Sequence, residues 1–207
     1  MNIPNLNRRA LIVGGAAILA NTGFSNGSAL ATPDPMSKEA VLFDPDAPVL
    51  GNPKGDVTIV EFFDYQCPYC KKSHPDVVRL VKADGHIRHV MKDWPIFGKP
   101  SLYASRLVLA AGKDMAKARN ALLATPGRLT VEQINDTLAT VGLDQKTLNA
   151  AYSRDKDRIN ALLTRNSGQA ESFDLMGTPA YVIGTTLYPG VLTPSNMKTA
   201  VAMARGD

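Results

Sequence analysis

Hydrophobic positions along the chain follow two different periods, and the alternation between them divides the sequence into segments. Residues 57–63 form a run rich in β-branched and aromatic side chains, which predicts a buried strand. Residues 71–81 space their apolar side chains as an amphipathic helix does. Apolar and polar positions alternate again over residues 86–92, which predicts a second strand. A strand, a helix and a strand in this order predict a βαβ unit with parallel strands.

The middle of the chain, from residue 101 to about 173, carries only helical periodicity. We expect a helix over 102–111 capped by Ser101, one over 113–123, one that opens on the capping box at 130–133, one capped by Asp144, and one over 154–169.

Strand character returns near the C-terminus. Residues 178–184 and 187–191 are expected to pair as a hairpin, followed by a last helix over 196–204 that begins at Ser195. The predicted order is therefore β-α-β, a helical block, and β-β-α. This order predicts an α/β fold with an inserted all-helical block.

The first 31 residues are typical of an export signal. Arg8 and Arg9 precede an apolar run over residues 10–20, and residues 29–31 form a small-x-small cleavage site. The apolar run is short for a membrane span, so we expect cleavage rather than an uncleaved anchor. The paired arginines also raise twin-arginine export as an alternative. Either route predicts a protein that leaves the cytoplasm, for the periplasm or another exported location.

The segment that follows, residues 32–48, contains four prolines and is expected to be extended, with a short edge strand over 40–43. It is short and lacks heptads, so we expect no oligomerisation segment there, and a monomer. The whole chain has a net charge of +4. Without Arg8 and Arg9 there are 21 basic and 19 acidic residues, a net charge of +2. That balance excludes the electrostatic footprint of a nucleic-acid-binding protein.

Candidate chemistry is concentrated where the first strand meets the first helix. Cys67 and Cys70 are the two cysteines of the chain, and Pro68 between them suits a first helical turn. Free backbone N–H groups and the helix dipole favour an anion at this point, so the pKa of Cys67 is expected to fall. Cys70, one turn later on the same face, is expected to act as the resolving thiol.

Two other interpretations of the cysteine pair stay open at this point. A structural disulfide would close a ring of only four residues, which stabilises little. A zinc site would use Cys67, Cys70, His86 and His89, although the histidine spacing is shorter than usual. His74 is expected to be a partly exposed helix residue rather than a ligand.

These features together resemble the DsbA-like branch of the thioredoxin superfamily, from about residue 49 to the end. The resemblance rests on Glu-Phe-Phe-Asp-Tyr-Gln-Cys-Pro-Tyr-Cys at 61–70, Trp-Pro-Ile at 94–96, and Met-Gly-Thr-Pro-Ala-Tyr at 176–181. Within this branch the chain resembles the Com1-like and ScsC-like periplasmic proteins, which favour Asp-Tyr-x-Cys-Pro-Tyr-Cys. The resemblance implies a thioredoxin-like fold over 49–207, a central mixed sheet flanked by helices, with a helical insertion at about 101–173. Trp94 is expected to pack in the core or in a lid.

The resemblance also assigns roles to three residues outside the cysteine pair. It implies a cis peptide bond between Thr178 and Pro179 beside the active site, with the Thr178 backbone open to a substrate strand. From the residues alone, a trans proline at a strand start is the alternative. It further implies that Glu61 lies near the buried cysteine and shuttles protons. Separately from the resemblance, we expect Lys92 to be the partner of Glu61. The alternative for Glu61 is a carboxylate that faces solvent.

The expected function is that of an exported thiol–disulfide oxidoreductase that needs no organic cofactor and no metal. Its partners would be exported proteins with cysteines and a membrane redox protein, DsbB-like or DsbD/ScsB-like. We expect a dithiol oxidase, although the dipeptide Pro68-Tyr69 lacks the histidine common in such oxidases and Thr178 is more typical of reductases or isomerases. A reductase or isomerase linked to copper tolerance is therefore the alternative. A module that binds copper(I) or zinc through the two cysteines is a further alternative.

Overall fold

The computed structural model describes residues 34–206. The predicted export signal lies outside this range. The strands are β1 (Val49–Gly51), β2 (Val57–Phe63), β3 (Ile87–Asp93), β4 (Ala180–Ile183) and β5 (Thr186–Pro189). The helices are α1 (Lys38–Leu42), α2 (Pro68–Asp84), α3 (Lys99–Ala110), the 3₁₀ turn η1 (Gly112–Asp114), α4 (Met115–Ala124), α5 (Val131–Thr140), α6 (Gln145–Ser172) and α7 (Pro194–Arg205).

The five strands form one mixed sheet in the order β1-β3-β2-β4-β5. Strands β2 and β3 are parallel and are joined through α2, which confirms the predicted βαβ unit. Strand β4 pairs antiparallel with β2 and with β5, which confirms the predicted hairpin. The sheet and its flanking helices make the thioredoxin-like fold that the resemblance implies.

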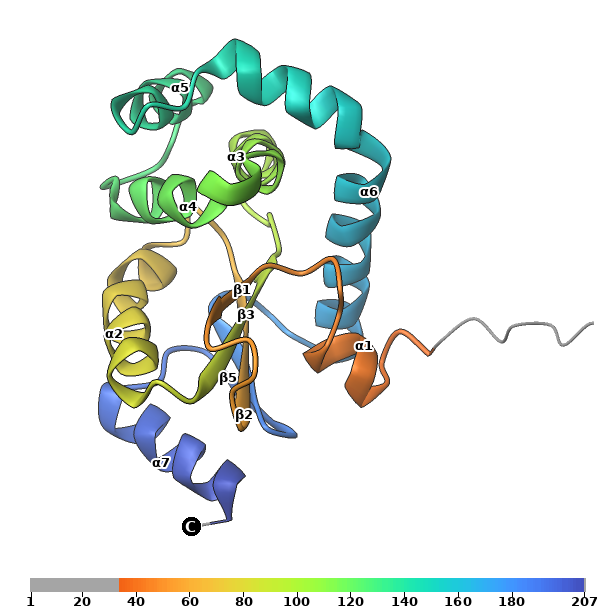
Figure 1. Cartoon of the computed structure of the whole chain (residues 1–207), viewed down its shortest axis with the longest axis vertical. Helices are drawn as coiled ribbons and strands as arrows, with labels where there is room; N and C mark the ends of the chain where they lie inside the picture. Colours follow the sequence, from red (N-terminus) through yellow and green to blue (C-terminus); the bar gives the residue numbers. More distant parts are fainter. Residues whose placement is uncertain (1–33, 207) are drawn as a thin grey trace, which may run out of the picture. The chain divides into compact units, whose positions relative to one another are not determined.

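Side chains of the central strand β2 alternate between two apolar clusters, one on each face of the sheet. Val57 and Ile59 pack with residues of α2 and α7 on one face. Val60 and Phe62 pack with residues of α1 and α6 on the other. Figure 1 shows α2 and α7 on one side of the sheet and α6 on the opposite side. Alternate residues along β2 and β3 therefore point to opposite faces of the sheet and contact different helices.

The helical block covers the end of the sheet at which β2 leads into Cys67 (Figure 1). A third apolar cluster joins the block to this end of the sheet. It combines Phe63, Tyr65 and both cysteines with side chains of α3, α4, α5 and α6. The block therefore supplies part of the wall around the candidate site.

Two boundaries inside the block differ from the prediction. Helix α3 begins at Lys99 after Gly98, so Ser101 lies inside the helix and does not cap it. The two helices expected after Asp144 are one helix, α6, of 28 residues. Its middle is mostly exposed, so apolar periodicity is lost there while the backbone hydrogen bonds continue. The capping box of α5 at Thr130 and the cap of α6 at Asp144 are confirmed.

The segment before the sheet also differs from the prediction. The expected edge strand over 40–43 is wrong, because Lys38–Leu42 forms α1, capped by the Ser37 side chain. A short apolar run fits a strand or one helical turn equally well, and here the cap decides. The segment packs on α6, where Arg165 donates to both carboxylate oxygens of Asp44 at 2.7 and 2.8 Å. The edge strand on this side of the sheet is β1 instead.

Helix α7 begins at Pro194 with Thr193 as its cap, two residues earlier than expected. Trp94 is buried in the cluster on the α6 face, as expected. In residues 34–206, none of the helices has a stretch that is long and apolar enough to span a membrane.

Candidate active site

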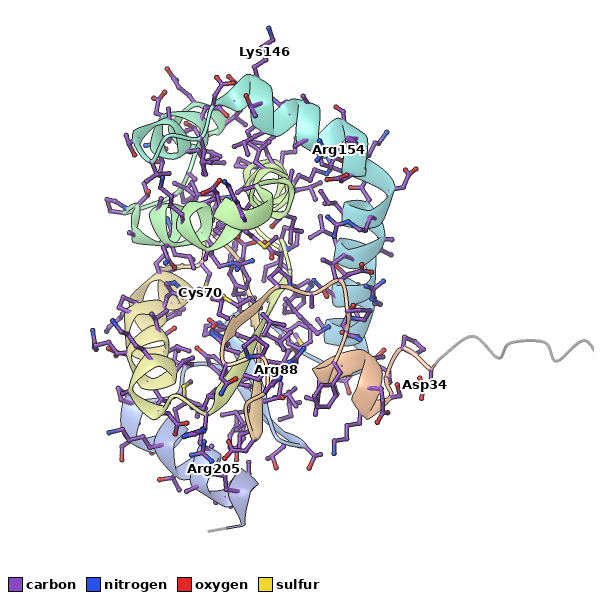
Figure 2. The ribbon with its side chains drawn as sticks, in the orientation of Figure 1. Asp34, Cys70, Arg88, Lys146, Arg154 and Arg205 are labelled. Atoms are coloured by element: carbon purple, nitrogen blue, oxygen red, sulfur yellow. The ribbon has the colours of Figure 1, made fainter. Side chains whose placement is uncertain are left out.

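The two cysteines lie at the N-terminus of α2, as predicted. Cys67 is the N-cap and Pro68 is the first helical residue. The Cys67 sulfur accepts a hydrogen bond from the backbone N–H of Cys70 at 3.4 Å. Both thiols are free and each residue is 1% exposed. Figure 2 labels Cys70 close to the end of α2 that faces the helical block.

A distant segment of the chain completes the surroundings of Cys67. The Cys67 thiol donates a hydrogen bond to the carbonyl oxygen of Thr178 at 3.1 Å. The peptide bond between Thr178 and Pro179 is cis. Residues 176–178 donate no backbone hydrogen bond to any residue in the described range. The backbone before Pro179 is therefore open beside the sulfur.

The surroundings of Cys67 favour its thiolate. Its pKa is lowered from 9 to about 6. The largest cause is a hydrogen bond from the Cys70 thiol, which burial opposes. The Thr178 side chain and the backbone N–H groups of Cys70 and Tyr69 lower the pKa further. The helix N-terminus therefore contributes as predicted, and the second thiol contributes more.

Cys70 is shifted in the opposite direction. Burial is the main cause that raises its pKa, and the hydrogen bond to Cys67 and the negative charges of Glu61 and Cys67 raise it further. At neutral pH the pair therefore holds one ionised sulfur and one protonated sulfur. Thiol–disulfide exchange needs this asymmetry, because the thiolate is the nucleophile.

Glu61 lies on the α2 face of β2 and is 1% exposed. Its carboxylate oxygen Oε2 is 3.0 Å from Nε2 of His89. The expected partner, Lys92, is wrong: Lys92 lies on the other face of the sheet, with its Nζ 3.6 Å from Asp44 Oδ2. Residues 89 and 92 differ by an odd number along β3, so their side chains point to opposite faces. The solvent-facing alternative for Glu61 is also wrong.

The histidines of the zinc interpretation do not meet the cysteines. His86 is exposed and precedes β3, while Cys67 follows β2. Because β2 and β3 are parallel, these two points lie at opposite ends of the sheet, roughly 20 Å apart for seven-residue strands. Within residues 34–206, no three metal-binding side chains are grouped as a metal site requires.

The expectation that His74 is partly exposed is wrong, because the residue is buried and only 6% exposed. It lies on the buried face of α2, one turn after Cys70. Its Nε2 is 2.9 Å from Oδ1 of Asn120 on α4. Burial lowers the pKa of His74.

Sequence reasoning assigned no separate role to Asp64 and Gln66, which hold the loop before Cys67. The Asp64 carboxylate accepts hydrogen bonds from the Gln66 backbone, the Phe97 backbone and the Ser101 hydroxyl. The Gln66 amide donates to the Phe97 carbonyl and to Ser101 Oγ, and its oxygen accepts from the Leu129 backbone. An aspartate whose side chain accepts a hydrogen bond from the backbone two residues later forms a common type of turn, so this contact of Asp64 could have been predicted from the sequence. The contacts of the Gln66 side chain are all distant in sequence, so no local pattern pointed to them.

Lys71 is a third residue to which the sequence analysis gave no role. Its Nζ donates to the carbonyl oxygens of Thr125 and Gly127 at 2.7 and 2.6 Å. These bonds tie the start of α2 to the loop between α4 and α5. Burial lowers the pKa of Lys71, while the negative charges of Asp64 and Cys67 raise it.

Two hollows flank the active site on the surface. One, of about 650 Å³, lies between the segment around Pro179 and the end of β5. The other, of about 530 Å³, is lined by Cys67 itself and reaches toward the loop after α4. Tyr69 and Met176 line both hollows and are 62% and 98% exposed. The surface around the thiol is therefore open and largely apolar.

Residues 44–202 match the profile of the thioredoxin family. The chain belongs to this family. A thiol:disulfide interchange protein DsbA from Burkholderia cepacia is 27% identical over 177 residues, covering 81% of this chain and 82% of that protein. A Na(+)/H(+) antiporter NhaA 1 from Salinispora arenicola is 26% identical over 170 residues, but the match covers only 26% of that protein and 79% of this chain.

Solved structures show the same relationship. A thioredoxin-like oxidoreductase from Silicibacter pomeroyi is 36% identical with a TM-score of 0.78, covering 83% of this chain and 99% of that one. The thiol-disulfide exchange protein alpha-DsbA2 from Wolbachia pipientis is 27% identical with a TM-score of 0.74, covering 80% and 90%. The catalytic domain of Proteus mirabilis ScsC is 26% identical with a TM-score of 0.69, covering 82% and 94%. This member of the thioredoxin family is a DsbA-like thiol–disulfide oxidoreductase.

Proposed function

We propose that the protein is an exported dithiol oxidase in which Cys67 exchanges disulfides with substrate proteins and Cys70 resolves them. The observation that carries the proposal is the opposite shift of the two thiols, which lowers the pKa of Cys67 to about 6 and raises that of Cys70. A stabilised Cys67 thiolate favours the reduced protein, so the oxidised form gives up its disulfide readily.

The reaction proceeds in two exchanges. A substrate thiolate attacks the Cys67 sulfur of the Cys67–Cys70 disulfide, and Cys70 leaves and takes up a proton. The second substrate thiolate then attacks the substrate sulfur of the mixed disulfide. The substrate disulfide forms, and Cys67 leaves as a thiolate. The protein ends with two more electrons, and a membrane partner of the DsbB-like type would restore its disulfide.

The segment before Pro179 is the proposed docking edge for the substrate. Its open backbone, with the Thr178 carbonyl 3.1 Å from the Cys67 sulfur, supports the pairing of an extended peptide across the active site. The apolar hollows at Tyr69 and Met176 would take side chains on either side of the substrate cysteine. Glu61, buried near Cys70, is the proposed proton acceptor for that thiol.

The proposal extends to location and assembly. The relatives named DsbA and ScsC, together with the export signal that the first 31 residues predict, support a periplasmic location. Residues 34–48 pack on α6 rather than extending away from it, which supports a monomer. Size-exclusion chromatography with light scattering tests the second point, and a dimer or trimer would contradict it.

The reduction potential of the cysteine pair tests the direction of the reaction. We expect equilibrium with glutathione to give a value between those of thioredoxin, about −270 mV, and DsbA, about −120 mV. The oxidised protein should also oxidise a peptide with two cysteines, and Cys67→Ser should not. A potential at or below that of thioredoxin would contradict the oxidase and would favour a DsbD/ScsB-linked reductase.

A further inference from the structure

His74 lies between the candidate site and a cleft on the surface. The cleft, of about 250 Å³, opens between α2 and α4 and is lined by Lys71, His74, Pro75 and Asn120 among others. Asn120 is exposed, and its Oδ1 lies 2.9 Å from Nε2 of His74. One edge of the imidazole therefore reaches the solvent side of the protein.

The other edge of the ring faces inward. Nδ1 of His74 is buried and has no hydrogen-bond partner among residues 34–206. With the Asn120 carbonyl as acceptor, Nε2 carries the hydrogen and Nδ1 of the neutral ring holds a lone pair. Buried polar atoms without a partner are uncommon, and a catalytic role is one explanation for such an atom. The inward nitrogen is therefore a proton acceptor.

Titratable groups on β2, β3 and α4 act on the His74 ring. Burial is the largest influence and lowers the pKa of His74; Asn120 and the charge of Glu61 raise it, and His89 and Arg119 lower it. Tyr181 on β4 has a raised pKa, chiefly because it is buried, and its hydroxyl lies 3.3 Å from Ser73 Oγ, so it stays protonated. Lys71 lines the cleft, with its ammonium group bonded to two carbonyl oxygens. Of these groups, the neutral His74 ring is the one that both reaches the cleft and accepts a proton.

Disulfide formation requires a path by which the proton of Cys70 reaches solvent. Cys70 is protonated and buried, and it must lose its proton when it bonds to Cys67. Glu61 and His89 are each 1% exposed, so this pair alone has no contact with solvent. A substrate that is bonded to Cys67 occupies the hollows in front of it and closes that face. The proton therefore needs an exit on another side.

We propose that His74 carries the proton of Cys70 between the buried pair of Glu61 and His89 and the cleft between α2 and α4. This inference rests on the proposed function of the cysteine pair. As the Cys70 sulfur attacks Cys67 in a mixed disulfide, the Cys67–Cys70 bond forms and the partner thiolate leaves. The proton of Cys70 passes to Glu61 and then to Nδ1 of His74, and the ring releases its Nε2 proton to water in the cleft. When the disulfide is reduced, Cys70 regains a proton by the same route.

A single-turnover reaction isolates this step. The reduced protein is mixed with 5,5′-dithiobis(2-nitrobenzoate), which forms a mixed disulfide at Cys67. Attack by Cys70 then releases a second thionitrobenzoate, which is followed by its absorbance in a stopped-flow instrument. We expect His74→Gln to slow this release on the order of tenfold near neutral pH. The matched control is His86→Gln, which removes an exposed histidine and should release at the wild-type rate.

Chemical rescue separates proton transfer from a structural role. His74→Ala leaves space that opens on the cleft, so added imidazole should accelerate release in this variant by several-fold more than in wild type. Asn120→Leu alters only an exposed position and removes the acceptor that orients the ring, so it should also slow release. If His74→Ala does not fold, Asn120→Leu decides the question.

The experiment distinguishes a failure of the proposed role of His74 from a failure of the proposed function of the cysteine pair. A wild-type protein that never releases the second thionitrobenzoate contradicts the role of the cysteine pair itself. Normal release by the wild type, matched by the His74 and Asn120 variants over the whole pH range and without imidazole acceleration, overturns the role of His74 alone.

Discussion

The sulfur of Cys67 lies 3.1 Å from the carbonyl oxygen of Thr178, although 111 positions separate the two residues in the sequence. The sheet brings them together. Strand β2 leads into Cys67, β4 follows Pro179, and the two strands pair antiparallel with Phe62 opposite Ala180. The register of one strand pair therefore sets the gap between the thiol and the open backbone where a substrate is proposed to bind.

Selective alkylation should distinguish the two cysteines. Iodoacetamide reacts with thiolates, so the reduced protein should be modified at Cys67 alone, with a rate that rises through a midpoint near pH 6. Cys70 should stay unmodified across this range because its pKa is raised. Peptide mapping after brief labelling measures both sites, with Cys67→Ser as the control. Equal labelling of the two residues at mildly acidic pH would contradict the assignment.

The side chain of Thr178 should tune the thiolate. Its hydroxyl has no hydrogen-bond partner within residues 34–206 while Cys67 is protonated, and it lowers the pKa of Cys67. Thr178→Val keeps the shape and the backbone but removes this donor, so the pKa of Cys67 should rise by about one unit. Thiolate absorbance against pH measures the change, and Thr178→Ser is the control that keeps the hydroxyl. An unchanged pKa in Thr178→Val would show that the hydroxyl does not contact the thiolate.

Lys92 should make stability depend on pH. It is fully buried, and burial lowers its pKa to about 8. The unfolded chain keeps its usual pKa of about 10.4, so between pH 8 and 10 the unfolded state binds more protons and stability rises with pH. Lys92→Met should therefore raise the free energy of unfolding at pH 7 by about 1 to 3 kcal/mol, with a smaller gain at pH 9.5.

Asp44 keeps its two hydrogen bonds from Arg165 in this variant, so no carboxylate is left without a partner. Urea unfolding at the two pH values measures the difference. Lys72→Met, which replaces an exposed lysine, is the control and should change little at either pH. A destabilised Lys92→Met at pH 7 would show that the ion pair with Asp44 outweighs the burial of the charge.

Arg119 should couple the helical block to the sheet. This arginine of α4 is fully buried, with its Nη2 3.5 Å from Asp93 Oδ2 at the end of β3 and its guanidinium over the ring of Phe63. Arg119→Met leaves the Asp93 carboxylate buried without its charge partner, so it should lower the free energy of unfolding by about 3 kcal/mol.

A double-mutant cycle with Asp93→Asn isolates the pair. The double variant should lose less than the sum of the two single variants, because each single variant leaves one buried charge without its partner and the double variant leaves none. Urea unfolding measures each variant, and Lys117→Met on the exposed side of α4 is the control. Additive losses would show that the two residues do not interact.

Features that depend on neighbouring residues were predictable from the sequence. The capping box of α5 joins Thr130 to Gln133 within one turn. The position of Cys67 at the start of α2 follows from the change from strand to helix periodicity and from Pro68. The partners of Glu61 and Asp44 were not predictable in this way, because they lie on other elements. Lys92 was assigned to Glu61 on charge alone, whereas the alternation along β3 places His89 on that face.

The amino-acid sequence by itself determined the βαβ unit, the position of the two thiols at the start of a helix and the family to which the chain belongs. These features depend on periodicity, caps and turn residues, which act over a few positions. Tertiary structure alone decided which partners hold the residues around the site: His89 for Glu61 through strand register, the helical block for Lys71 and Gln66, and Asn120 for His74 through the packing of α2 against α4. Such contacts depend on how whole elements are positioned, and short-range patterns carry no record of that.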